Sequence, residues 1–190
     1  LGRKPEVLVL NGLDIDKFPT FEETSILHRK AREVTREFLS YYFLPYYNID
    51  LQDSLNFFIF GRNEYKNKGI DIFTKSLGLL NQELKKQKNA KTVFSFFFIP
   101  CSASNINFSL LESKNKFTQI KELIDKEQEE IQQNLITNLL NDHKLEAENL
   151  LSKKFLSEVK RNILGFKSKG TPPLSTHNVD ENSEMMRGFR

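Results

Sequence analysis

The residues best suited to chemistry in this sequence are two cations, Arg62 and Lys68, in a polar loop that runs from Gly61 to Gly69. An arginine offers a forked set of donors and a lysine a compact charge, and both bind phosphate groups. We expect free backbone N–H groups at the start of the next helix, near Lys68, to add direct hydrogen bonds. The loop therefore predicts an anion-binding site, and a solvated loop with two ordinary cations remains the alternative.

A strand and a helix must hold this loop in place. The apolar run Phe57 to Phe60 is short, aromatic and closed by Gly61, which predicts a buried strand over 56–60. After the loop, apolar residues recur at steps of three and four and share one face of a helix over about 68–87. They are Ile70, Phe73, Leu77, Leu80 and Leu84. In such a unit, ligands bind beyond the carboxyl end of the strand, where Arg62 and Lys68 stand.

The neighbouring segments extend an α/β pattern. Val7 to Leu10 and the phenylalanine-rich run 92–99 both read as buried parallel strands. The second of these should pair with strand 56–60 through a right-handed crossover. With only three convincing strands, the sheet is unfinished in this chain. Upstream, Thr20 predicts the cap of a helix of about twenty residues, which Pro45 should end.

The composition changes after Pro100. From Phe117 to about Phe166 the chain is rich in Lys, Glu, Gln and Leu, and two apolar stripes are separated by Asn141-Asp142-His143. This pattern predicts an αα-hairpin. The first stripe is interrupted by Glu127 and is typical of a coiled-coil seam. Its residues are Phe117, Ile120, Ile124, Ile131 and Leu135. The hairpin would either associate with a second copy or pack on its own second helix.

Size and charge limit the classes of function. A chain of 190 residues with 38% apolar content can form a core, and its net charge of +3 comes from cations interspersed with acids. That distribution argues against nucleic acid as the partner. A single cysteine, Cys101, excludes an intramolecular disulfide and fits a reducing cytosol. No run approaches the roughly 20 apolar residues that span a membrane, so a soluble protein is expected.

Other chemistry receives little support. The histidines His28, His143 and His177 are scattered, and Cys101 has no partner at ligand spacing, so neither a metal nor a cofactor is predicted. Neighbouring glutamates such as Glu129-Glu130 diverge on a helix and indicate a solvated face. The sequence thus predicts part of a binding site and no complete catalytic centre.

Four segments carry a family resemblance. The loop Gly61–Gly69 resembles the Gly-Arg-Tyr-Glu-…-Asn-Lys-Gly signature of glycogen synthases of the animal and fungal type (glycosyltransferase family 3). Three further matches occur in the same order as in that family. They are Asn11-Gly12-Leu13-Asp14 with Lys17-Phe18, Phe97-Phe98-Ile99-Pro100 with Asn105 and Phe108, and Pro172-Pro173-Leu174-Ser175-Thr176-His177-Asn178.

The resemblance implies an α/β fold that is part of a two-Rossmann-domain (GT-B) glycosyltransferase with an inserted α-helical hairpin. Because the chain begins at Leu1 and both ends look cut, we expect an interior segment of a longer enzyme. Four parts are expected: 1–52 as the end of the N-terminal domain and the crossover, 53–112 as the start of the C-terminal domain, 113–170 as the inserted hairpin, and 171–190 as the return to the C-terminal domain and its sheet.

The resemblance further implies transfer of glucose from UDP-glucose to the non-reducing end of an α-1,4-glucan such as glycogen, with retention of configuration, in the cytoplasm. Arg62 and Lys68 match the family residues that bind the donor diphosphate. Asn63 replaces a family tyrosine, Phe60 replaces a small residue, and the paired-glutamate motif is absent, so the segment alone should be inactive. The alternatives are a non-catalytic fragment that assembles through 113–170, and a related GT-B transferase with another donor or acceptor.

Overall fold

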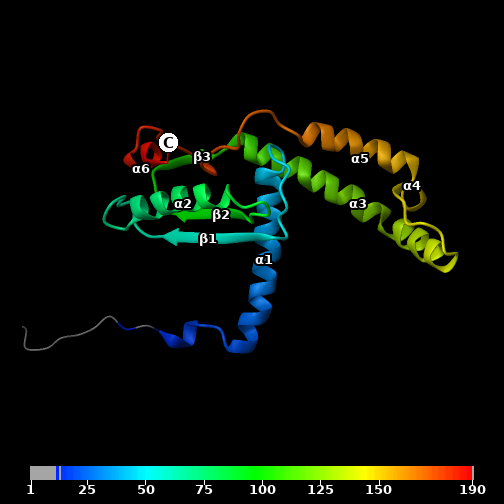
Figure 1. Ribbon diagram of the computed structural model, residues 1–190, viewed down its shortest axis with the longest axis horizontal. Helices are drawn as coiled ribbons and strands as arrows, with labels where there is room; N and C mark the ends of the chain where they lie inside the picture. The colour runs from blue at the N-terminus through cyan, green and yellow to red at the C-terminus, as the bar shows by residue number, and fades with distance from the viewer. Residues whose placement is uncertain (1–11, 13, 190) are drawn as a thin grey trace, which may run out of the picture. The chain divides into compact units, whose positions relative to one another are not determined.

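The structure is a computed structural model that describes Gly12 and residues 14–189 (Figure 1). It divides into two compact units, residues 1–37 and 38–190. The strand predicted over Val7 to Leu10 lies outside the described residues. The other predicted elements all fall within them.

The first unit contains a short 3-10 helix, η1 (Ile15–Lys17), and the beginning of α1 (Phe21–Phe43). The cap predicted at Thr20 is confirmed. The hydroxyl of Thr20 accepts the N–H of Glu23 at 3.3 Å, and the Glu23 carboxylate accepts the N–H of Thr20 at 2.8 Å. This reciprocal pair satisfies two N–H groups at the helix start. The helix ends at Phe43, shortly before Pro45, as predicted.

The second unit is built around a strand–helix–strand element. Strands β1 (Ser54–Phe60) and β2 (Thr92–Phe98) are joined by α2 (Ile70–Leu84). They pair in parallel, from Ser54 opposite Thr92 to Phe60 opposite Phe98, which confirms the predicted parallel pairing. Helix α2 lies along the two strands (Figure 1), and the ring of Phe73 meets that of Phe97 edge-on at 5.4 Å.

The expectation that strand 56–60 is buried is wrong for this chain. The side chains of Phe58 and Phe60 are 63% and 73% exposed, and Phe98 on β2 is also exposed. In the described part of the chain, β1 and β2 form a sheet of two strands, so β1 has a free edge. An apolar run shows that a strand is suited to burial, but it does not show which segment covers it.

A second sheet was not anticipated from the sequence. Strand β3 (Ala103–Ile106) pairs antiparallel with β4 (His177–Val179). Within the described residues, the strand that follows residue 171 pairs with β3 and not with the β1–β2 sheet. Both strands are too short to show a periodic pattern. Beyond β4, the five-residue helix α6 (Glu184–Gly188) buries Met185 and Met186.

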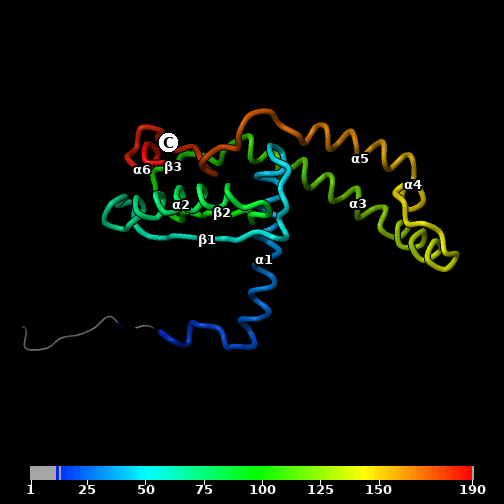
Figure 2. Tube along the Cα trace, in the orientation of Figure 1, coloured from blue at the N-terminus to red at the C-terminus, as the bar shows by residue number. Residues whose placement is uncertain are grey.

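Three helices follow β3 and precede β4 along the chain. They are α3 (Phe108–Leu140), α4 (Ala147–Leu150) and α5 (Lys153–Phe166). Helices α3 and α5 run side by side (Figure 2). Helix α3 begins upstream of residue 113, the predicted start of the hairpin, because the side chain of Asn107 caps it by accepting the N–H of Ser109 at 3.1 Å. That this pair of helices is an insertion, and the four-part domain division itself, stay predictions.

Two contacts join the end of α1 to the segment after α5. The hydroxyl of Tyr42 donates to the carbonyl of Pro173 at 2.5 Å, and Lys167 Nζ donates to the carbonyl of Leu44 at 2.8 Å. Burial raises the pKa of Tyr42 to about 12, with a smaller contribution from Tyr46. The buried apolar residues of this unit include Leu39, Ile70, Phe94, Leu110, Phe155 and Phe166.

Candidate anion-binding site

The loop between β1 and α2 has a defined path. The N–H of Gly61 donates to the carbonyl of Phe98 at 3.3 Å, which continues the ladder past the end of β1. The chain then turns, with the N–H of Glu64 bonded to the carbonyl of Arg62 at 2.8 Å. At its other end, Gly69 has φ 68°, a left-handed conformation that suits glycine, and α2 begins at the next residue.

Lys68 returns to the end of the strand. A Cβ placed on Gly61 would lie 3.6 Å from Cγ of Lys68, with Cβ and Cδ of Lys68 also within 4 Å. The aliphatic stem of Lys68 therefore passes over Gly61, directly before Arg62 in the chain. Both Arg62 and Lys68 are exposed. The structure thus places the stem of Lys68 against Gly61, the residue next to Arg62, at the carboxyl end of β1.

The N–H groups of residues 68 to 71, which were expected to be free at the start of the helix, are already bonded, and this part of the prediction is wrong. The N–H of Lys68 bonds to Glu64, that of Gly69 to Lys66, and those of Ile70 and Asp71 to Tyr65, at 3.0 to 3.3 Å, all through backbone carbonyls. The turn folds back onto the start of α2 and uses the N–H groups of Ile70 and Asp71. An anion here would be bound chiefly by the side chains of Arg62 and Lys68.

Sequence reasoning missed Tyr65, which lies at the centre of the loop. Its carbonyl accepts the N–H groups of Ile70 and Asp71, and its hydroxyl lies 3.4 Å from the carbonyl oxygen of Gly188 in α6. One carboxylate oxygen of Asp71 is buried and has no hydrogen-bond partner among the described residues. Tyr65 carries no charge, so its residue type does not indicate a role in phosphate binding.

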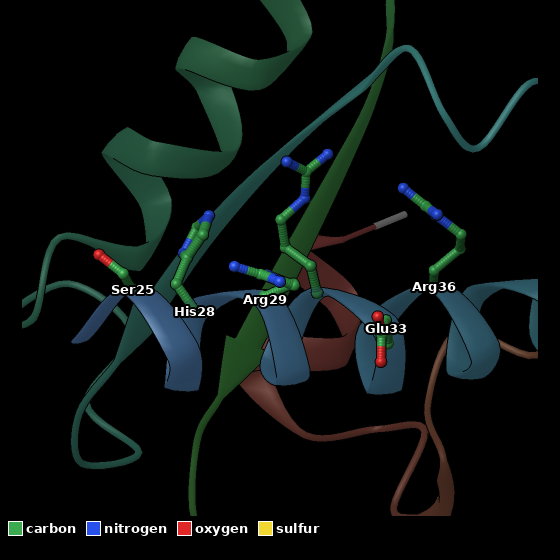
Figure 3. A pocket seen from close by; sticks show the side chains of 6 residues that line it. Ser25, His28, Arg29, Glu33 and Arg36 are labelled. Carbon is green, nitrogen blue, oxygen red and sulfur yellow. The ribbon is translucent and has the colours of Figure 1, made fainter. Parts of the chain in front are cut away.

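A basic surface in the first unit was also missed. Ser25, His28, Arg29, Arg32, Glu33 and Arg36 line a shallow hollow of about 370 Å³ on α1. Figure 3 shows the labelled side chains distributed along this one helix. The spacing 25, 28, 29, 32 and 36 is the signal in the sequence, because steps of three and four share a helix face. A surface that concentrates cations in this way attracts anions.

The described residues contain no group of three or more His, Cys, Asp or Glu side chains placed to hold a metal ion. None of the helices in this part of the chain is long and apolar enough to cross a membrane.

Known proteins match this chain over nearly its whole length. The family model described as glycogen synthase matches residues 1–186. The glycogen (starch) synthase of Dictyostelium discoideum is 34% identical over 193 residues, which cover 100% of this chain and 22% of that protein. The glycogen (starch) synthase of Caenorhabditis elegans is 34% identical over 183 residues, with 94% and 27% covered. The human liver glycogen (starch) synthase is 32% identical over 183 residues, with 96% and 26% covered. The chain thus spans about a quarter of the length of these relatives.

Proposed function

The chain belongs to the glycogen synthase family, and from this premise we propose that its protein transfers glucose from UDP-glucose to the 4-hydroxyl at the non-reducing end of an α-1,4-glucan, with retention of configuration. In this proposal the chain supplies the loop that binds the donor diphosphate. The fold would be completed by a second Rossmann-like domain across a cleft, the GT-B arrangement, with the helices of 113–170 as an insertion.

The observation that carries the proposal is the placement of Lys68 over Gly61, next to Arg62, at the carboxyl end of a parallel strand. This is the edge at which α/β proteins bind ligands. When the bond between glucose and UDP breaks, negative charge builds on the leaving diphosphate. Cations held at that position stabilise the transition state more than the ground state.

The test compares alanine variants in the full-length protein that contains this chain. A charge-assisted contact contributes roughly 1.5–3 kcal/mol, so Arg62→Ala and Lys68→Ala should each lower kcat/KM for UDP-glucose about tenfold to a hundredfold. Lys66 lies in the same loop and is exposed, so Lys66→Ala serves as the matched control and should change little. If Lys66→Ala lowers kcat/KM as much as the other two variants do, the loop acts only through its overall positive charge, and the assignment of Arg62 and Lys68 is wrong.

The alternative is a related transferase with another donor or acceptor. A comparison of transfer rates with different nucleotide sugars as donors distinguishes a different donor from UDP-glucose. If GDP-, ADP- or TDP-linked sugars are used in preference to UDP-glucose, the proposed donor is wrong, whereas the proposed fold is unaffected.

We also propose that the protein is cytoplasmic, which agrees with its single cysteine, Cys101.

Self-association through 113–170 is the second function proposed for this chain. The observation that favours it is exposed apolar surface on α3 and α5, where Leu140 of α3 and Leu164 of α5 are 80% and 77% exposed. Ile124 on the predicted seam is also exposed, whereas Ile131 and Glu127 are half-buried. The seam is therefore only partly covered within the described chain, and a second copy would cover the remainder.

A further inference from the structure

Gly188 and Tyr65 are in direct contact, although one lies in α6 and the other in the loop after β1. A Cβ placed on Gly188 would overlap the hydroxyl and the ring of Tyr65. The tyrosine hydroxyl lies 3.4 Å from the Gly188 carbonyl oxygen. The contact therefore requires a residue without a side chain at position 188, since any Cβ would push the ring away.

Helix α6 is a firm support for this contact. Its residues Met185 and Met186 are buried, and the side chain of Ser183 caps it by accepting the N–H of Met186 at 3.3 Å. Directly after Gly188, the ring of Phe189 meets that of Phe97 on β2 edge-on, with centroids 4.6 Å apart. Packing of this kind fixes the backbone of position 188 against the same strand pair from which the loop departs.

Tyr65 transmits this support to the whole loop. Its backbone carbonyl receives the N–H groups of both Ile70 and Asp71, at 3.1 and 3.3 Å. Its ring is held by α6, and its backbone by the first turn of α2. Arg62 precedes it by three residues and Lys68 follows it by three, so a shift of Tyr65 displaces the chain that carries both cations.

We propose that Gly188 is a positioning residue for the diphosphate-binding loop: it leaves the space that the ring of Tyr65 needs, and Tyr65 in turn sets the placement of Arg62 and Lys68. This proposal rests on the proposed function, because it takes a sugar nucleotide as the ligand. Helix α6 thereby becomes part of the donor site without touching the donor.

The experiment measures Gly188→Ala in the full-length protein against Gly78→Ala. Gly78 lies in α2, and a Cβ there would meet nothing within 4 Å, so this control adds the same methyl group without a clash. Because a misplacement of about 1 Å can cost on the order of a hundredfold, Gly188→Ala should raise Kd for UDP and KM for UDP-glucose about tenfold or more. Hydrogen exchange of the segment 61–73 should also accelerate. Loss of folded protein alone would lower kcat and leave KM unchanged.

A double-mutant cycle assigns the effect to Tyr65. In a Tyr65→Ala background the added methyl group finds no ring, so Gly188→Ala should change Kd for UDP less than about twofold. If Gly188→Ala matches Gly78→Ala in UDP affinity and in exchange, or costs as much without Tyr65 as with it, the positioning role is overturned while the proposed function stands. If the unmodified protein neither binds UDP nor uses UDP-glucose, the proposed function fails and takes this inference with it.

Discussion

The aliphatic stem of Lys68 lies across Gly61, with ordinary van der Waals spacing between them. Because a Cβ on Gly61 would sit 3.6 Å from Lys68 Cγ, one methyl group fits there, whereas atoms beyond the Cβ would have to displace the stem of Lys68. We expect Gly61→Ala to keep kcat/KM for UDP-glucose within about twofold of the unmodified enzyme. Gly61→Leu should lower it on the order of tenfold, since it displaces Lys68. Equal losses in both variants would show that the backbone of Gly61 matters rather than its contact with Lys68.

The second prediction concerns the geometry of Arg62. Arg62→Lys keeps the charge and removes the forked donor set, which matches two phosphate oxygens at once. The variant should recover less than half of the free-energy loss measured for Arg62→Ala, as judged from kcat/KM for UDP-glucose. Full recovery in the lysine variant would mean that Arg62 acts as a point charge only. Circular dichroism of each variant checks that the fold is retained.

The local sequence pattern was sufficient to predict the strand–helix–strand unit, because 57–60 and 92–98 are short apolar runs and the apolar residues of 70–84 recur at steps of three and four. The residue types next to these elements were sufficient to predict the cap at Thr20 and to place the two candidate cations at one end of β1. These features depend on residues close together in the chain, where local spacing decides the geometry.

Most of the features that were missed depend on contacts that the spacing of residues within one element does not show. The exposure of Phe60 depends on what else pairs with β1, and the pairing of β3 with β4 joins residues 103–106 to 177–179. The contact of Tyr65 with Gly188 likewise joins the loop to α6. The satisfied N–H groups of Ile70 and Asp71 depend on how the turn folds back, which composition does not show. None of these contacts can be predicted from the spacing of apolar residues along the chain.

The third prediction tests association through α3 and α5. Ile124 is 45% exposed on α3, so a charge there is tolerated in the folded chain but is unfavourable at an apolar interface. We expect Ile124→Lys, and more strongly Ile124→Lys with Ile131→Lys, to lower the particle mass measured by light scattering. Leu79→Lys on α2, where the side chain is 64% exposed, is the control. An unchanged mass in the double variant would exclude this surface as the interface.

The fourth prediction concerns the turn that ends α3. Asn138 is buried, its Nδ2 donates to the carbonyls of Asn134 and Asn149, and its Oδ1 lies 3.3 Å from His143 Nδ1. Asn138→Ala removes these hydrogen bonds, each worth about 0.5–1.5 kcal/mol, and should destabilise the protein by about 1–3 kcal/mol. Asn141→Ala removes one exposed hydrogen bond, to Thr137, and should cost less than about 0.5 kcal/mol. Urea unfolding measures both, and similar costs would mean that Asn138 does not hold the turn together.

The fifth prediction follows from the buried hydroxyl of Tyr42. Its pKa is raised to about 12 from an ordinary value of 10.0, so the folded state retains this proton after the unfolded state has lost it. The stabilisation is fully present below pH 10 and declines as the pH rises toward 12, because the unfolded chain then binds fewer protons than the native one.

Tyr42→Phe removes both the titration and the hydrogen bond to Pro173. At pH 8 the variant should be less stable by about 1 kcal/mol. The gap between wild type and variant should then narrow and change sign as the pH is raised from 9 to 11.5, since only the wild type loses the contribution of this proton, and that loss exceeds about 1 kcal/mol before pH 11.5. Thermal unfolding at a series of pH values measures the gap. Tyr47→Phe, which removes the hydroxyl of an exposed tyrosine, controls for the substitution at pH 8. A gap that stays constant across this range would contradict the raised pKa and the burial that causes it.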